Sequence, residues 1–308
     1  MRATYYALSV ANRFYKFFIQ MRLFAMSMCV VPCPCGPPVC PLEASIQAAY
    51  MDPIAKSKHF LCIENQFFVS GMDVNGIVLN RIIQALVDRI ERAVQRDERF
   101  RVYVVMPLLP PFEGNMRSHE LPNLHAVMRW KFATISRCRY SLFKALKGVT
   151  DHPENYVAFF GLRKYGIMPN GSVSTEQEYI HSKFMIVDDR CAIIGSSNIN
   201  DRSMNGDRDS DIALVIEDMQ FEDGMMNEKP YRRCITASKL RLQMFREHLG
   251  LSHDDTSIAD ATSDHKCHSI NSTASNNTKI FEAVFDCAPS NRMRAFVNFQ
   301  RIEVTEIF

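Results

Sequence analysis

This sequence lacks both a charge bias and a long uninterrupted apolar run. Its 308 residues carry 36 lysines and arginines against 34 aspartates and glutamates, which leaves a net charge of +2. Charges that nearly cancel give no global attraction to nucleic acid, although a local basic patch remains compatible with them. The apolar run Leu23–Val31 is too short and too interrupted to span a bilayer. A hydrophobic content of 47% at this length predicts a globular protein with a sizeable core.

Cysteine is too scarce for a disulfide scaffold, with ten residues in the whole chain. Six of the cysteines are scattered without pairing spacing, which favours a reducing, cytoplasmic compartment. The other four lie between Cys29 and Cys40, and their spacing is not that of the usual zinc sites. A zinc centre there is a minority interpretation.

Residues 1–43 differ from the rest of the chain. Arg13, Lys16 and Arg22 precede the apolar run, and five prolines follow it between Pro32 and Pro41. A secretory signal has a similar order of parts but a shorter positive region, and S-acylated cysteines would also fit. We predict an unassigned leader without regular structure.

From residue 44 the pattern becomes that of an α/β protein. Apolar and β-branched runs predict strands at 59–71, 101–110, 156–162 and 211–218, with two more inside 179–201. Helical periodicity predicts helices at 76–95, 123–136, 142–146 and 232–249. Strands that alternate with long helices predict a layered β-sheet flanked by helices over residues 44–250.

The last part of the chain has a different composition. Residues 251–278 are rich in Ser, Thr, Asp, Asn and His, which predicts a flexible polar linker. Residues 279–308 would then form a separate carboxyl-terminal segment.

The stretch YIHSKFMIVDDRCAIIGSSNIND (179–201) holds polar residues at suggestive intervals. Side chains alternate between the faces of a strand, so His181 and Lys183 share one face, as do Ser196 and Asn198. A two-residue loop at 189–190 would place His181 opposite Asn198 and Lys183 opposite Ser196. A longer loop or a one-residue slip stays open, because Asp-Arg is a poor hairpin turn.

An imidazole, an ammonium, an amide and a hydroxyl together suit a tetrahedral oxyanion. Lys183, Ser196 and Asn198 would hold phosphate oxygens and stabilise charge in the transition state. His181 would attack phosphorus or protonate the leaving oxygen. No pair of carboxylates presents itself as a metal-binding set, so we predict phosphoryl transfer that uses no metal and no cofactor.

Asp188 and Asp211 have different expected roles. Asp188 has the opposite parity to His181, so it should face away from the polar group and act architecturally near the strand end. A carboxylate is also needed to orient the imidazole. Asp211 is the candidate, with Asp207 and Asp209 behind it.

These residues resemble a known signature. His181-Ser182-Lys183, four residues and then Asp188 is similar to the HxKxxxxD motif of the phospholipase D superfamily, with Gly195-Ser196-Ser197-Asn198 as its usual companion. The stretches IENQFFVSG, FRVYVVMPLLPPFEG and NINDRSMNGDRDSD resemble the eukaryotic phosphatidylcholine-hydrolysing members. The resemblance covers roughly residues 44 to 249.

That resemblance implies half of an active site. The family carries two HxKxxxxD motifs whose histidines face each other, one as nucleophile and one as acid and base, through a phosphohistidine. The present chain is similar to the second half, so His181 would be the acid/base partner. The chain contains no other HxK. The resemblance therefore implies a phospholipid substrate at a membrane surface, a complementary first-motif half or a homodimer as partner, no nucleic acid, and peripheral attachment to membranes. It also makes residues 279–308 a truncated segment.

Other residues have expected roles around the site. The resemblance places Glu64, Asn65 and Gln66 in a loop that borders the site, with an equal alternative that they satisfy the backbone at a strand end. Asp201 and Arg202 are expected to brace the loop after Asn198, and Trp130 to pack in a helix.

Three functions stay open at this point. The chain could supply one half of a phospholipase D, it could be a non-catalytic fragment that binds lipid headgroups or a partner, or it could form a homodimer that cleaves another phosphodiester. Near-neutral charge counts against nucleic acid as that substrate.

Overall fold

A computed structural model describes residues 21–27, 44–72, 76–110, 122–206 and 208–285. Its strands are β1 (Met21–Ser27), β2 (Phe60–Asn65), β3 (Arg101–Val105), β4 (Val157–Phe160), β5 (Arg163–Ile167), β6 (Val173–Gln177), β7 (Lys183–Val187), β8 (Cys191–Gly195), β9 (Asp211–Glu217), β10 (Phe221–Met226) and β11 (Lys229–Cys234). Its helices are α2 (Ser45–Lys56), α3 (Ile82–Gln95), α4 (Pro122–Phe132), the π-helix η1 (Ala133–Arg137), α5 (Leu142–Lys147), the 3₁₀-helix η2 (Pro153–Asn155), α6 (Asp201–Met204), α7 (Ile235–Leu249) and α8 (Asp264–Val284).

Seven strands form the central sheet in the order β1-β9-β8-β7-β2-β3-β4. β2, β3 and β4 are parallel to one another, and the strands from β7 to β1 add in antiparallel fashion. Parallel neighbours need a crossover, and here helices lie between β2 and β3 and between β3 and β4 in the sequence. The hairpins β5–β6 and β10–β11 stand outside this sheet.

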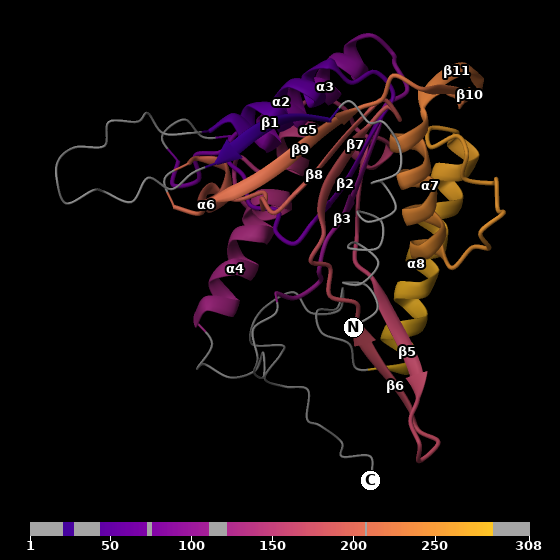
Figure 1. Cartoon of the computed structure of the whole chain (residues 1–308). Coiled ribbons are helices and arrows are strands. Elements are labelled where there is room, and N and C mark those ends of the chain that lie inside the picture. Colours follow the sequence, from indigo (N-terminus) through magenta and orange to yellow (C-terminus); the bar gives the residue numbers. More distant parts are fainter. Residues whose placement is uncertain (1–20, 28–43, 73–75, 111–121, 207, 286–308) are drawn as a thin grey trace.

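Helices cover both faces of the sheet, and Figure 1 shows α2, α3 and α5 on one side and α7 and α8 on the other. Alternation along β2 sends Leu61 and Ile63 into the core under α2, α3 and α5, and Phe60 and Cys62 into the core under α7 and α8. All six residues of β2 are therefore buried. The predicted layered α/β sheet is confirmed.

The helix α3 begins later than predicted. Its apolar face, including Ile83, Leu86 and Ile90, is fully buried, as its periodicity predicts. Leu79, however, precedes the helix and is 55% exposed, although the predicted helix at 76–95 includes it. The Asp201 carboxylate accepts hydrogen bonds from the backbone N–H groups of Leu79 (2.8 Å) and Asn80 (2.9 Å). That contact from a distant helix holds the segment in a non-helical conformation.

The predicted leader without regular structure is wrong over Met21–Ser27. These residues form β1, which pairs antiparallel with β9 from Met21↔Ile216 to Ser27↔Asp211. An extra strand satisfies backbone groups of β9 that would otherwise lie at a sheet edge. The cysteine cluster between Cys29 and Cys40 lies outside the described residues.

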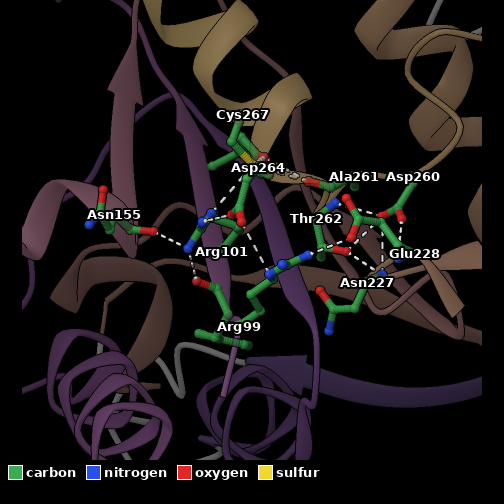
Figure 2. Close-up of polar contacts among 12 residues, drawn as sticks. Arg99, Arg101, Asn155, Asn227, Glu228, Asp260, Ala261, Thr262, Asp264 and Cys267 are labelled. Carbon is green, nitrogen blue, oxygen red and sulfur yellow. Dashed lines mark hydrogen bonds and ion pairs between the residues drawn. The ribbon is translucent and has the colours of Figure 1, made fainter. Parts of the chain in front are cut away.

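The predicted flexible linker at 251–278 is also wrong from residue 264 onward, because α8 begins at Asp264 and runs past residue 279. Figure 2 shows how its start is anchored to the sheet: the Asp264 carboxylate lies 2.7 Å from Arg101 and 3.2 Å from Arg99. Asp260 accepts hydrogen bonds from the N–H groups of Glu228 (2.8 Å) and Thr262 (2.9 Å). A polar composition indicated a linker, but specific ion pairs and side-chain-to-backbone hydrogen bonds hold this segment.

The end of α7 agrees with the prediction. Gly250 adopts φ 65°, a left-handed conformation that glycine takes without a steric penalty, directly after the last helical residue. The start differs, because residues 229–234 form β11 and the helix begins at Ile235 rather than Arg232.

Candidate active site

The hairpin β7–β8 has a longer loop than the sequence predicted. Its pairs run from Phe184↔Ile194 to Val187↔Cys191, so residues 188–190 form a three-residue loop. The predicted opposition of His181 with Asn198 and of Lys183 with Ser196 is therefore wrong by one residue. Asp188 and Asp189 both adopt positive φ, 53° and 50°, which aspartate tolerates better than most residues. Long-range contacts hold both of them there.

Asp188 lies at the end of β7 away from His181 and binds backbone. Its carboxylate accepts hydrogen bonds from the N–H groups of Lys58 (2.7 Å), His59 (2.8 Å) and Phe60 (2.8 Å). The side chain is buried at 6% exposure. This motif aspartate thus ties the β7–β8 loop to the start of β2.

We predict that Asp188→Ala lowers stability by on the order of 3 kcal/mol, because it leaves three buried or partly buried N–H donors without an acceptor. Asp188→Asn, which keeps one acceptor and tolerates positive φ, is expected to lose less. Thermal melts of both variants measure this. An Asp188→Ala chain as stable as the wild type would contradict an architectural role.

His181 and Lys183 lie together at the opposite end of β7. Lys183 Nζ donates a hydrogen bond to the His181 carbonyl (2.6 Å) and lies 3.4 Å from His181 Nδ1. Lys183 is only 7% exposed, whereas His181 is exposed. A buried ammonium thus lies beside an accessible imidazole.

Burial lowers the pKa of both Lys183 and His181. Partial burial lowers the pKa of Lys183 to about 8, and the charge of Asp211 opposes that effect. The pKa of His181 is lowered from its ordinary value, first by burial and then by the positive charge of Lys183. The free site therefore holds a neutral imidazole at neutral pH.

The end of β2 supplies the partners of Lys183 and of the loop after β8. Gln66 Oε1 accepts a hydrogen bond from Lys183 Nζ (2.9 Å), and Gln66 Nε2 donates one to Tyr179 Oη (2.6 Å). Asn65 Oδ1 accepts from Ile199 N–H (3.1 Å). The stretch Glu64–Gln66 therefore borders the site, and Asn65 positions the loop that carries Asn198.

Ser196 does not directly oppose Lys183. Its hydroxyl donates to Asp211 Oδ1 (2.6 Å) and accepts from Ile212 N–H (3.1 Å). Asn198 Oδ1 and Asp211 Oδ2 are buried and have no hydrogen-bond partner among the described residues. The predicted bond from Asp211 to the His181 imidazole does not occur in this conformation, although Asp211 lies close enough to influence Lys183.

The other aspartates of this region have structural partners. Arg202 forms hydrogen bonds with both carboxylate oxygens of Asp209, the shortest at 2.8 Å, while Asp201 binds residues 79–80. Asp209 is thus engaged in bracing this loop, and Asp207 lies outside the described residues.

A second carboxylate lies beneath the motif. Glu64 Oε1 accepts a hydrogen bond from Ser182 Oγ, and Glu64 Oε2 lies 3.0 Å from His248 Nε2 on α7. Glu64 is 4% exposed, so this contact links β2, the residue between His181 and Lys183, and α7 inside the protein. No pattern in the sequence pointed to His248. Tyr179 is two residues before His181, so strand alternation could have predicted that it lies on the same face.

A metal site does not emerge from this geometry. Within the described ranges, no group of three or more His, Cys, Asp or Glu side chains is placed to hold a metal ion. The positive charge beside His181 is that of Lys183.

Comparisons with known proteins agree with this arrangement. A family model described as Phospholipase D matches residues 40–178 and 172–293. The chain is 83% identical over 268 residues to Phospholipase D of Phytophthora infestans, covering 87% of this chain and 15% of that protein. It is 43% identical to Phospholipase D zeta 1 of Arabidopsis thaliana (84% and 24% covered) and 40% identical to Phospholipase D2 of Bos taurus (86% and 28% covered).

The chain therefore belongs to the phospholipase D family. It spans between 15% and 28% of the length of these three relatives. Nuc from Salmonella typhimurium, a solved structure described as a phospholipase D family member, is 15% identical to this chain with a TM-score of 0.33, and the match covers 69% of this chain and 91% of that chain.

Proposed function

We propose that this chain supplies one half of a phospholipase D active site, which hydrolyses phosphatidylcholine to phosphatidic acid and choline and can transfer the phosphatidyl group to a primary alcohol. His181 is the acid/base group. Lys183 and Asn198 hold the phosphate oxygens. Ser196 acts indirectly, because its hydroxyl donates a hydrogen bond to Asp211. The nucleophilic histidine, which would form the phosphohistidine, comes from a complementary first-motif half or from a second copy of this chain.

One observation carries the proposal: the buried Lys183 ammonium faces an exposed histidine without a carboxylate partner. Among the described residues, no carboxylate lies within ion-pair distance of Lys183, and its hydrogen bonds go to Gln66 and to His181. A buried cation is costly unless a charge compensates it. A phosphodiester anion provides that compensation, and the neighbouring imidazole is then in place for proton transfer.

The proton on His181 depends on the same anion. Burial and Lys183 keep the imidazole neutral in the free site, whereas an acid must be protonated before the leaving oxygen departs. A bound phosphate offsets the charge of Lys183 and raises the pKa of His181. Substrate binding therefore loads the proton that the reaction needs.

We expect this coupling to be visible in an NMR titration of the imidazole. A soluble dialkyl phosphate should raise the pKa of His181, and EDTA should leave the shift unchanged because protein groups bind the anion. Lys183→Met should raise the pKa of His181 in the free protein, since it removes a positive neighbour, and should abolish the response to the anion. The His181→Asn spectrum assigns the signal among the nine histidines.

Lys239→Met, on an exposed lysine of α7, is the control and should change neither value. A His181 signal that ignores the dialkyl phosphate, or one that responds equally well in Lys183→Met, would sink the proposed phosphate site.

The substrate implies a position at a membrane. None of the described helices is long and apolar enough to cross a bilayer. We propose peripheral attachment on the cytoplasmic side, through surface contacts.

A further inference from the structure

One segment of the chain is strongly basic although the whole chain is nearly neutral. Residues 121–150 contain six lysines and arginines and no aspartate or glutamate. The chain as a whole has 36 basic and 34 acidic residues. The local imbalance therefore cannot follow from the average composition.

The structure places most of these charges on the surface. They lie on α4, on η1 and the turn after it, and on α5, which adjoin one another (Figure 1). Five of the six are exposed: Arg129, Arg137, Arg139, Lys144 and Lys147. We call residues 129–147 the basic segment.

These five cations lack acidic partners. Within the described ranges, none of them lies within ion-pair distance of a carboxylate, unlike Arg99 and Arg101 at the other edge of the sheet. Instead, Arg137 lies 4.7 Å from the ring centroid of Phe132, and Arg139 lies 5.5 Å from that of Tyr140. Their charge is therefore available to an external anion.

Aromatic side chains accompany the charges. Trp130, which we expected to pack in a helix, lies on α4 and keeps 38% of its surface exposed, and Tyr140 is 45% exposed. Exposed Trp and Tyr beside basic residues are typical of proteins that contact the interfacial region of a bilayer.

The basic segment is fixed to the site's edge of the sheet. Thr134 in η1 exchanges hydrogen bonds with the backbone of Ser70, 3.2 Å in each direction, and Ser70 lies four residues after Gln66, the partner of Lys183. Lys131, buried at 5% exposure, donates to the carbonyl of Pro107, just beyond the end of β3. These contacts place the segment beyond the carboxyl ends of β2 and β3, as the site is.

We propose that the basic segment docks on a phospholipid surface that contains anionic lipids. Its charges match phosphate and carboxylate headgroups, and Trp130 and Tyr140 suit the layer just below them. The reason to propose a bilayer rather than nucleic acid rests on the proposed function, because a phospholipase site must approach a lipid headgroup. Anionic product would then strengthen attachment.

Vesicle co-sedimentation of the whole 308-residue chain tests this. Phosphatidylcholine vesicles that contain phosphatidic acid should bind the chain, vesicles without it should bind far less, and added salt should weaken binding. Combining Arg129→Gln, Arg137→Gln and Arg139→Gln should weaken partitioning on the order of a hundredfold, at roughly fivefold per cation. Trp130→Ala should weaken the salt-resistant part of the binding.

The matched control combines Arg96→Gln, Lys229→Gln and Lys239→Gln, three exposed cations outside the basic segment. Both triple variants have the same net charge, so only the segment's variant should lose binding. Equal losses in both, salt-independent binding, or a preference of the wild type for a duplex oligonucleotide over anionic vesicles would each overturn the proposal. Melting curves identify any variant that fails to fold, and Trp130→Ala then carries the test.

The vesicle experiment and the His181 titration together distinguish failure of the lipid-binding surface from failure of the phosphate site. Specific binding to anionic vesicles, with no response of His181 to a dialkyl phosphate, would support the surface and reject the phosphate site. Loss of vesicle binding with an intact response of His181 to the dialkyl phosphate would reject the lipid-binding surface and support the phosphate site.

Discussion

A His181→Asn chain is expected to lose at least about a thousandfold of any phosphodiesterase activity that an assembly containing the wild-type chain shows. His181 is the exposed imidazole beside Lys183, and asparagine can neither attack phosphorus nor shuttle the proton. The stability change should stay within about 1 kcal/mol, since the side chain is exposed. Choline release and thermal melts measure the two effects.

The same reasoning predicts that the monomer is essentially inactive towards phosphatidylcholine. One HxKxxxxD motif supplies one histidine, whereas the two-step reaction needs a nucleophile and an acid on opposite sides of phosphorus. If two copies build the site, His181 must face His181 across a two-fold axis. A polypeptide that carries the first motif is the other possible partner, and we expect it to be the one that restores activity.

Mixing experiments distinguish the two assemblies. In a homodimer, equal amounts of wild type and His181→Asn should give about a quarter of the wild-type activity, below the half expected from dilution, because only a quarter of random pairs are wild type. With a first-motif partner, activity should follow the amount of the wild-type chain. Concentration-independent activity from a monomer verified by sedimentation would falsify the shared-site proposal.

The largest loss of stability is expected for Arg241→Met. Arg241 and Asp189 are both 0% exposed and form two hydrogen bonds of 2.8 Å, while Arg241 also donates to the carbonyls of Ile258 and Ala259. Removing the guanidinium leaves a buried carboxylate without compensation, which costs about 3–5 kcal/mol. Urea titration of the variant measures the loss.

Two further variants control for this result. Combining Arg241→Met with Asp189→Asn removes the uncompensated charge and keeps a residue that tolerates the positive φ at this position, so part of the stability should return. Arg99→Met, which breaks exposed ion pairs with Glu228 and Asp264, should cost about 1 kcal/mol or less. An Arg241→Met chain that melts like the wild type would show that this buried pair does not hold α7 to the loop.

Much of the site could be predicted from a single stretch of sequence. The alternation of a strand was enough to place His181 and Lys183 together, and parity was enough to direct Asp188 away from them. These inferences hold because neighbours on one strand have a geometry fixed by the backbone. Helix periodicity predicted the buried face of α3 for the same reason.

The register of the hairpin could not be predicted in this way. Asp188 binds backbone groups 128 to 130 residues away, and Asp189 binds Arg241 52 residues away, so distant partners hold the three-residue loop. Composition likewise indicated a linker where Arg101, 163 residues earlier, pairs with Asp264 at the start of α8.

The sequence by itself determined the layered α/β class, the identity of the motif residues and the end of α7 at Gly250, because each depends on short-range periodicity or on one residue's backbone preference. Only the tertiary structure decided which hydrogen-bond donors each carboxylate binds. It assigned Asp188 to β2, Asp189 to α7, Asp201 to residues 79–80 and Asp211 to Ser196. A carboxylate binds whichever donor the fold brings within about 3 Å, and chain neighbours do not reveal that donor.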